Sequence, residues 1–154
     1  MTDMETPDMT TVLSRLLATP LPFKARLADR IANLAAVFPD DYDGRQLSAR
    51  SASGLVDFLE AGPPSGYPDL TLTPAGDCYA EWRGPQGRKV AIEFLDSGEA
   101  HHLLFHPNPR HPQRIDRLAG TTTTDALPET MAKAGPILIS ADGWGNLVGG
   151  TAIW

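Results

Sequence analysis

Four short runs of residues between positions 69 and 107 constrain the fold more than any other feature of the sequence. The runs cover residues 69–73, 78–83, 89–95 and 100–106, and turn-forming residues separate each run from the next. Alternation of apolar and polar residues is typical of strands that bury one face, and short connections containing Gly or Pro suit hairpins. The stretch therefore predicts an antiparallel meander.

The register of this meander is predicted by asking which pairing makes one face apolar. A two-residue loop at Ser97-Gly98 is expected to pair Phe94 with His101 and so fix the last hairpin. With the other turns, this register predicts an apolar face of Leu70, Leu72, Cys78, Ala80, Trp82, Val90, Ile92, Phe94, Leu103 and Phe105. The opposite face is predicted to be polar and to carry Tyr79, Glu81, Arg83, Glu93, His102 and His106.

Two amphipathic segments precede the meander. Apolar residues at three- and four-residue steps predict a helix over about 20–38, which Pro39 is expected to end. A second helix is predicted to begin near Ser48, a candidate N-cap, and Gly54 inside it would allow a close approach to a neighbouring element. We therefore expect an α+β fold, with a four- to six-stranded antiparallel sheet and the N-terminal helices packed on one of its faces.

After residue 107 the pattern weakens. Residues 115–119 are expected to form a helical turn, and residues 126–134 predict a short helix. Two further strands are predicted at 136–140 and 147–154. The last third of the sequence lacks the regular alternation and turn signals of the meander.

Composition is that of a globular protein, with 42% apolar and 21% charged residues. We expect residues 1–10 to be a disordered tail and residues 11–154 to form a single α+β domain. No apolar stretch approaches the roughly 20 residues of a membrane helix, and the acidic N-terminus is unlike a signal peptide, so we expect a cytoplasmic protein. The single cysteine, Cys78, excludes an intrachain disulfide and is expected to be an inert core thiol.

All four histidines, His101, His102, His106 and His111, fall within eleven residues. On a strand, His102 and His106 would stand about 13 Å apart at about 3.3 Å per residue. A zinc ion must lie about 2 Å from each ligand, so one strand cannot supply both. We expect no metal site and no cofactor, and the sequence contains neither a G-x-G-x-x-G nor a P-loop motif.

A second cluster is predicted on the polar face, where the derived register places Glu93 directly across from His102. Glu81 would lie one strand further on. Two carboxylates and an imidazole on adjacent strands could serve acid–base chemistry, but the same pattern also describes charge pairs on a hydrated sheet surface. A small-molecule binder or enzyme that uses Glu81, Glu93 and His102 is therefore the alternative function, and the sequence favours a non-enzyme.

Two groups of residues are candidates for an interface. Arg110, Arg114 and Arg117 form a small basic segment in a Pro-rich stretch, which could hold a phosphate or an acidic partner surface. Trp144 and Trp154 are large aromatic residues near a Gly-rich C-terminus, where they either complete the core or anchor a partner. A net charge of −6 without a broad basic stripe makes the chain a poor candidate for direct nucleic-acid binding.

The order of several short motifs resembles that of a loosely defined group of small bacterial α+β proteins of uncharacterised function. The motifs are FPDDYDG at 38–44, TPAGD at 73–77, EWR at 81–83 and VAIEF at 90–94. The resemblance covers just over half of the chain and implies no activity, catalytic residue or cofactor. Genes of this kind often lie near mobile elements, which implies an accessory role.

The sequence thus favours a non-catalytic cytoplasmic protein that acts by binding another protein. One concrete form of this hypothesis is an accessory or inhibitory factor encoded by a mobile element, such as an antagonist of a host defence complex. A homodimer is a further option, since the edge strands of a small sheet can pair with a second copy.

Overall fold

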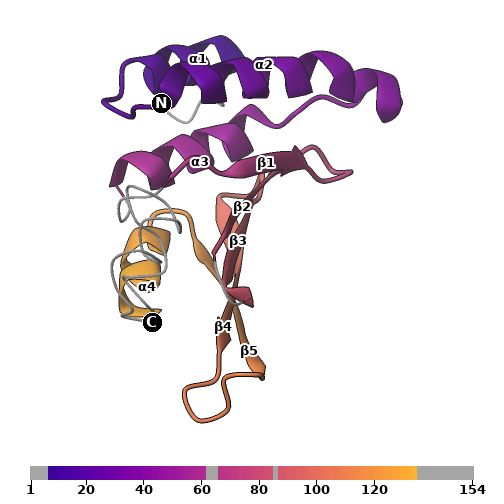
Figure 1. Ribbon diagram of the computed structural model, residues 1–154. Helices are drawn as coiled ribbons and strands as arrows, with labels where there is room; N and C mark the ends of the chain where they lie inside the picture. Colours follow the sequence, from indigo (N-terminus) through magenta and orange to yellow (C-terminus); the bar gives the residue numbers. More distant parts are fainter. Residues whose placement is uncertain (1–6, 62–65, 85–86, 135–154) are drawn as a thin grey trace.

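A computed structural model describes residues 7–61, 66–84 and 87–134 of the chain. The elements follow the order α1 (Met9–Leu17), α2 (Lys24–Asp41), α3 (Ala49–Ala61), β1 (Asp69–Leu72), β2 (Cys78–Arg83), β3 (Lys89–Phe94), β4 (Glu99–Pro107), β5 (Ile115–Thr123) and α4 (Leu127–Ala134). The strands form one sheet in the order β1-β2-β3-β4-β5, and every pairing is antiparallel. The predicted α+β class and the meander are confirmed (Figure 1).

Helix α3 lies between the sheet and helices α1 and α2 (Figure 1). It is buried on most of its circumference, because it packs on α1 on one side and on β2 and β3 on the other. The Ser51 hydroxyl joins it to the sheet by donating to the carbonyl of Phe94 and accepting from the N–H of Cys78 at 2.7 Å. A Cβ at Gly54 would lie 3.3 Å from Thr124, so this glycine permits the close approach that was predicted.

The helix ends agree with the sequence in part. Ser48 caps α3, since its hydroxyl accepts from the N–H of Ser51 at 3.0 Å. Helix α2 runs from Lys24 to Asp41 rather than over 20–38, so the prediction that Pro39 ends it was wrong. Pro39 lies in the last turn, where a missing N–H removes only one of the final hydrogen bonds, and the helix closes with Tyr42 donating to the carbonyl of Phe38 at 3.1 Å.

Helix α1 begins earlier than the sequence suggested. Asp8 caps it by accepting from the N–H of Thr11 at 2.8 Å, so Met9 and Thr10, which were expected in the tail, belong to the helix. Val12 and Leu16 on its inner side are buried against the rest of the core.

The first two strand pairings have the predicted register, with Leu72 opposite Cys78 and Trp82 opposite Val90. The β1–β2 turn has three residues and ends at Gly76, whose φ of +89° is the left-handed value that favours glycine. A Cβ there would also lie 2.7 Å from the carbonyl oxygen of Gln46. Turn chemistry and alternation point to the same pairing here, which explains why the prediction holds.

The predicted pairing of β3 with β4 was wrong by one residue. Phe94 lies opposite Ala100 rather than His101. The loop has three residues instead of two, because the N–H of Leu95 donates to the carbonyl of Glu99 at 2.9 Å and Gly98 takes a φ of +94° as the last loop residue. Side-chain direction alternates along a strand, so this shift moves every β4 side chain to the face opposite the predicted one.

Residues 115–123 form strand β5, so the prediction of a helical turn at 115–119 was wrong. The strand pairs with β4 along its whole length, from Ile115 opposite Pro107 to Thr123 opposite Glu99. Within the described residues it is an edge strand with largely exposed side chains on both faces, and its sequence therefore lacks the alternation that marks a half-buried strand.

Helix α4 confirms the short helix predicted at 126–134, and its Leu127 and Met131 complete the core beside α3. The strands predicted at 136–140 and 147–154 lie outside the described residues. In the described part of the chain, all helices that contact the sheet pack on one of its faces, here called the core face. This face is made by Leu70, Cys78, Ala80, Trp82, Val90, Ile92, Phe94, Ala100 and Leu104. Among residues 7–61, 66–84 and 87–134, no helix has the length and apolar character needed to cross a membrane.

Candidate functional site

The candidate site is the face of the sheet opposite the core face, called the open face. The registers of β2, β3, β4 and β5 align its side chains in three rows that cross the strands. These are a distal row of Arg83, Lys89, Phe105 and Arg117, a middle row of Glu81, Ala91, Leu103 and Ala119, and a proximal row of Tyr79, Glu93, His101 and Thr121. Adjacent rows lie two residues apart along each strand, or about 7 Å.

The open face is less polar than the sequence predicted. The shift in the β4 register brings Leu103 and Phe105 onto it and moves His102 and His106 to the other side. Ala91 and Ala119 flank Leu103 in the middle row, so a band of small and aliphatic side chains crosses the centre of the face. Of the six residues predicted for the polar face, four lie on it: Tyr79, Glu81, Arg83 and Glu93.

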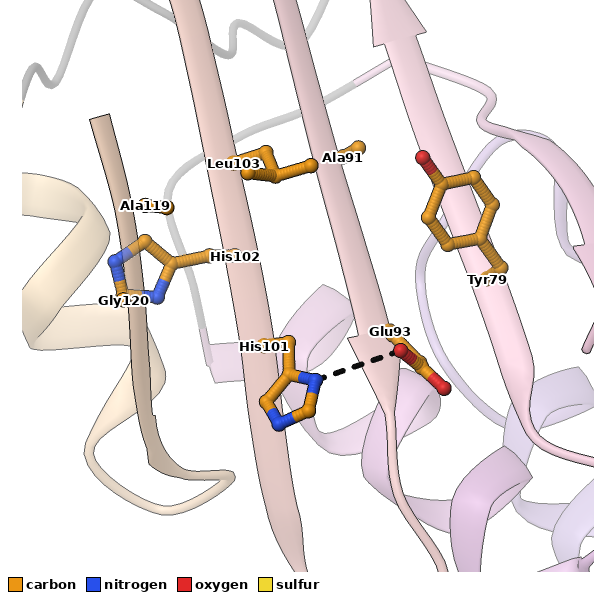
Figure 2. A pocket seen from close by; sticks show the side chains of 8 residues that line it. All are labelled: Tyr79, Ala91, Glu93, His101, His102, Leu103, Ala119 and Gly120. Atoms are coloured by element: carbon orange, nitrogen blue, oxygen red, sulfur yellow. Dashed lines mark ion pairs between the residues drawn. The ribbon is translucent and has the colours of Figure 1, made fainter. Parts of the chain in front are cut away.

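A shallow hollow of about 290 Å³ lies over the middle and proximal rows (Figure 2). Its lining residues come from four neighbouring strands: Tyr79, Ala91, Glu93, His101, His102, Leu103, Ala119 and Gly120. Figure 2 shows Tyr79 standing on β2 at one side, with Leu103 and Ala91 between it and β5. Ala91, Leu103 and Ala119 make its floor aliphatic, and Tyr79, Glu93 and His101 make one side of it polar.

Glu81 bonds to three neighbouring side chains on the open face. Its carboxylate accepts from the hydroxyl of Tyr79 at 3.2 Å and pairs with Arg83 at 2.8 Å and with Lys89 at 3.4 Å. Burial by itself raises the pKa of this carboxyl, but Lys89 and Arg83 together outweigh it and hold the pKa below its usual value. Burial, followed by the charge of Glu81, raises the pKa of Tyr79, so the phenol stays a hydrogen-bond donor.

The predicted acid–base cluster does not form. Glu93 lies opposite His101 rather than His102, and the ion pair runs from Nδ1 of His101 to Oε1 of Glu93 at 3.5 Å (Figure 2). His101 is exposed, and Glu81 sits on another row with its oxygens already taken. A general acid or base needs a free, positioned proton acceptor or donor near a substrate pocket, and this arrangement supplies an exposed cross-strand pair.

His102 is buried, and its ring packs against the backbone of β5 at Gly120. It is 7% exposed and its Nδ1 has no hydrogen-bond partner among the described residues. Its ring lies against Gly120, where an added Cβ would be 2.9 Å from both Cε1 and Nε2 (Figure 2). Burial, with a smaller contribution from His101, lowers the pKa of His102, so the ring is neutral at neutral pH.

The other histidines do not converge. His106 also lies off the open face, opposite Asp116, with its Nδ1 3.2 Å from the carbonyl oxygen of Pro107. Within the described part of the chain, no three His, Cys, Asp or Glu side chains come close enough together to hold a metal ion. Cys78 is buried beneath α3, and burial raises the pKa of its thiol to about 12, so the thiolate that reacts with oxidants or electrophiles is not populated.

The predicted basic segment lies at the distal end of the sheet. Arg110 is exposed in the β4–β5 turn, Arg114 pairs with Asp116 at 3.2 Å, and Arg117 stands in the distal row. Trp144 and Trp154 lie outside the described residues. Sequence reasoning missed Lys89 as an open-face residue, although its pairing with Arg83 follows from the predicted register. It also missed Leu103, Phe105 and Ala119, because their placement needs the β4 register and the existence of β5.

Comparison with known proteins adds no assignment: no family model, no curated protein and no solved structure matches the chain. The resemblance to small bacterial proteins therefore stays a prediction.

Proposed function

We propose that this protein acts by binding another protein through the open face of its sheet. The observation that carries the proposal is the register of β4, which places Leu103 and Phe105 among polar residues on a face that no helix of the described chain covers. An apolar centre with a charged rim is the composition of a protein–protein interface. The absence of the predicted acid–base cluster from the described residues removes the main support for catalysis.

Two features of the face support binding. Tyr79 and Arg83 are residue types that dominate the energetics of interfaces, and both are held in place by Glu81. The hollow between Tyr79 and Ala119 offers room for one partner side chain against an aliphatic floor. A preorganised surface loses less side-chain entropy when it is covered.

An accessory or inhibitory role in the cytoplasm, of the kind encoded by mobile elements, is the biological form of this proposal. It fits a small protein whose open face offers contact groups held in ion pairs. The alternative, a small-molecule binder, would use the same hollow near Tyr79, Glu93 and His101. A second copy pairing along β5 is the homodimeric version, and exposed Ile115 and Leu118 on that strand favour it.

The test is a comparative affinity purification from the native host. Leu103→Asp and Ala119→Glu place a charge in the middle row, while Val37→Asp adds a charge to the exposed side of α2. We expect proteins that are recovered with the wild type and with Val37→Asp to be lost with both open-face variants. Equal recovery with all four proteins, each shown to be folded by circular dichroism, would contradict the proposal.

A further inference from the structure

The distal end of the sheet is basic in a protein that is otherwise acidic. Residues 83–89 and 103–117 contain six of the chain's 13 Lys and Arg residues but one of its 19 Asp and Glu residues. The fold brings these two segments together, because the β2–β3 and β4–β5 connections lie at the same end of the meander. The fold therefore gathers the positive charge of two separate segments at one end of the sheet.

The distal row gives this charge a defined geometry. Arg83, Lys89, Phe105 and Arg117 stand side by side on four strands, and Nζ of Lys89 lies 5.0 Å from the centre of the Phe105 ring. A second hollow, of about 270 Å³, opens here and is lined by Arg83, Gly84, Gly87, Arg88, Lys89 and Phe105. Glu81 is shared by Arg83 and Lys89, whereas the exposed guanidinium of Arg117 has no partner among the described residues.

We propose that the distal row binds an acidic segment of the protein partner, which lies on the open face in extended conformation. The inference rests on the proposed function and names the chemistry of the partner. Charge complementarity carries it, because three cations and an aromatic ring share one row. Arginine beside an aromatic ring is a common receiver of carboxylates at interfaces, since its planar fork binds both oxygens.

The spacing of the rows adds a sequence preference. The middle and distal rows are about 7 Å apart, which is also the distance between side chains two residues apart on an extended strand. A partner segment with an apolar side chain over Leu103 would therefore place a carboxylate at the level of Phe105 when the two are separated by one residue. The preferred motif is an apolar residue and an Asp or Glu separated by one residue, and the row spacing fits either order.

A nucleic acid is the less suitable polyanion. Outside the two basic segments the chain carries seven Lys and Arg residues against 18 Asp and Glu residues, which would repel a strand longer than the distal row. A short acidic segment meets the cations of the distal row and avoids the acidic remainder.

The test uses two synthetic peptides and a short oligo-thymidine strand, titrated into ¹⁵N-labelled full-length protein at low ionic strength. One peptide carries a Leu followed two and four residues later by Glu, and the other replaces both Glu by Gln. We expect the Glu peptide to shift the amide signals of Lys89, Phe105 and Arg117. We expect the Gln peptide, or added salt, to weaken binding about fivefold.

Variants decide whether the distal row is responsible. Arg83→Gln combined with Arg117→Gln should weaken the Glu peptide about fivefold, whereas Arg45→Gln at the other end of the sheet should leave it unchanged. Equal binding of both peptides, an equal effect of Arg45→Gln, or tighter binding of the oligonucleotide would each overturn the proposal. If the Glu peptide binds as expected but native partners are still recovered with Leu103→Asp, the distal site is supported and the proposed function is contradicted. If native partners are lost with Leu103→Asp but are still recovered with the arginine variants and in added salt, the proposed function is supported and the distal site is contradicted.

Discussion

The core face and the open face belong to the same strands, yet they are built by different rules. On the core face Phe94 and Ile92 are fully buried and touch α3, and Phe94 lies 6.0 Å from Phe58 between ring centres. On the open face Phe105 and Leu103 are half-buried and lie opposite Lys89 and Ala91 of the neighbouring strand. The core face therefore specifies the fold, while the open face contributes less to it and is the face for which we propose a binding role.

The largest effect should separate the two faces directly. Phe94→Ala removes a fully buried ring from beneath α3 and should lower the free energy of unfolding by about 3–5 kcal/mol, since it loses burial and leaves a cavity. Phe105→Ala on the open face should cost about 1 kcal/mol or less. Urea denaturation of the two variants measures both values, and similar losses would mean that the faces are not distinct.

The next effect tests the fit between β4 and β5. Gly120→Ala brings a Cβ to 2.9 Å from the ring of His102, so the ring must move within a packed site. The free energy of unfolding should fall by about 1–3 kcal/mol. In His102→Ala the ring is gone, and the same glycine substitution should cost much less. A double-mutant cycle of Gly120→Ala and His102→Ala in urea measures this coupling. If the losses of the two single variants simply add in the double variant, the contact between Gly120 and His102 is contradicted.

The β3–β4 hairpin should show a smaller effect. Gly98→Ala puts a Cβ on a residue with a φ of +94°, in open space, so the cost is backbone strain alone, about 1–2 kcal/mol. A loss of this size in urea denaturation supports the left-handed backbone of Gly98 that closes the β3–β4 loop, and an unchanged free energy of unfolding would contradict it.

The smallest effect is a pH dependence of the free energy of unfolding that comes from the buried His102. His102 has a lowered pKa when folded, so between that value and the unfolded value of about 6.5 the unfolded chain binds more protons and stability rises with pH. The contribution is complete above about pH 6.5 and is lost as the pH falls through the lowered pKa, with a slope of at most about 1.4 kcal/mol per pH unit. His102→Leu should flatten the urea-derived profile below about pH 6.5, and an unchanged profile in His102→Leu would remove His102 as the cause.

Sequence reasoning reached the meander and two of its registers because turn chemistry and alternation agreed there. It failed at β4 because residues 100–106 offer apolar side chains on both faces, Ala100 and Leu104 on one and Leu103 and Phe105 on the other. The choice between them depends on contacts distant in sequence, including the space that Gly120 leaves for His102. Strand β5 was missed because an exposed edge strand needs no alternation.

The candidate site was predicted only in part for the same reason. Tyr79, Glu81, Arg83 and Glu93 lie on strands whose register was predicted correctly, and they are on the open face as expected. The apolar centre and the distal row require the β4 register and the existence of β5. No local pattern in the sequence contains that information.

The most direct test of the central claim, that the open face is a binding surface, is site-specific photocrosslinking in the native host. A benzophenone amino acid is placed at position 103, in the middle row, and in a second protein at position 37 on the exposed side of α2. We predict that irradiation yields a discrete covalent adduct with another protein from position 103 and none from position 37. No adduct at position 103, or the same adduct from both positions, would contradict it.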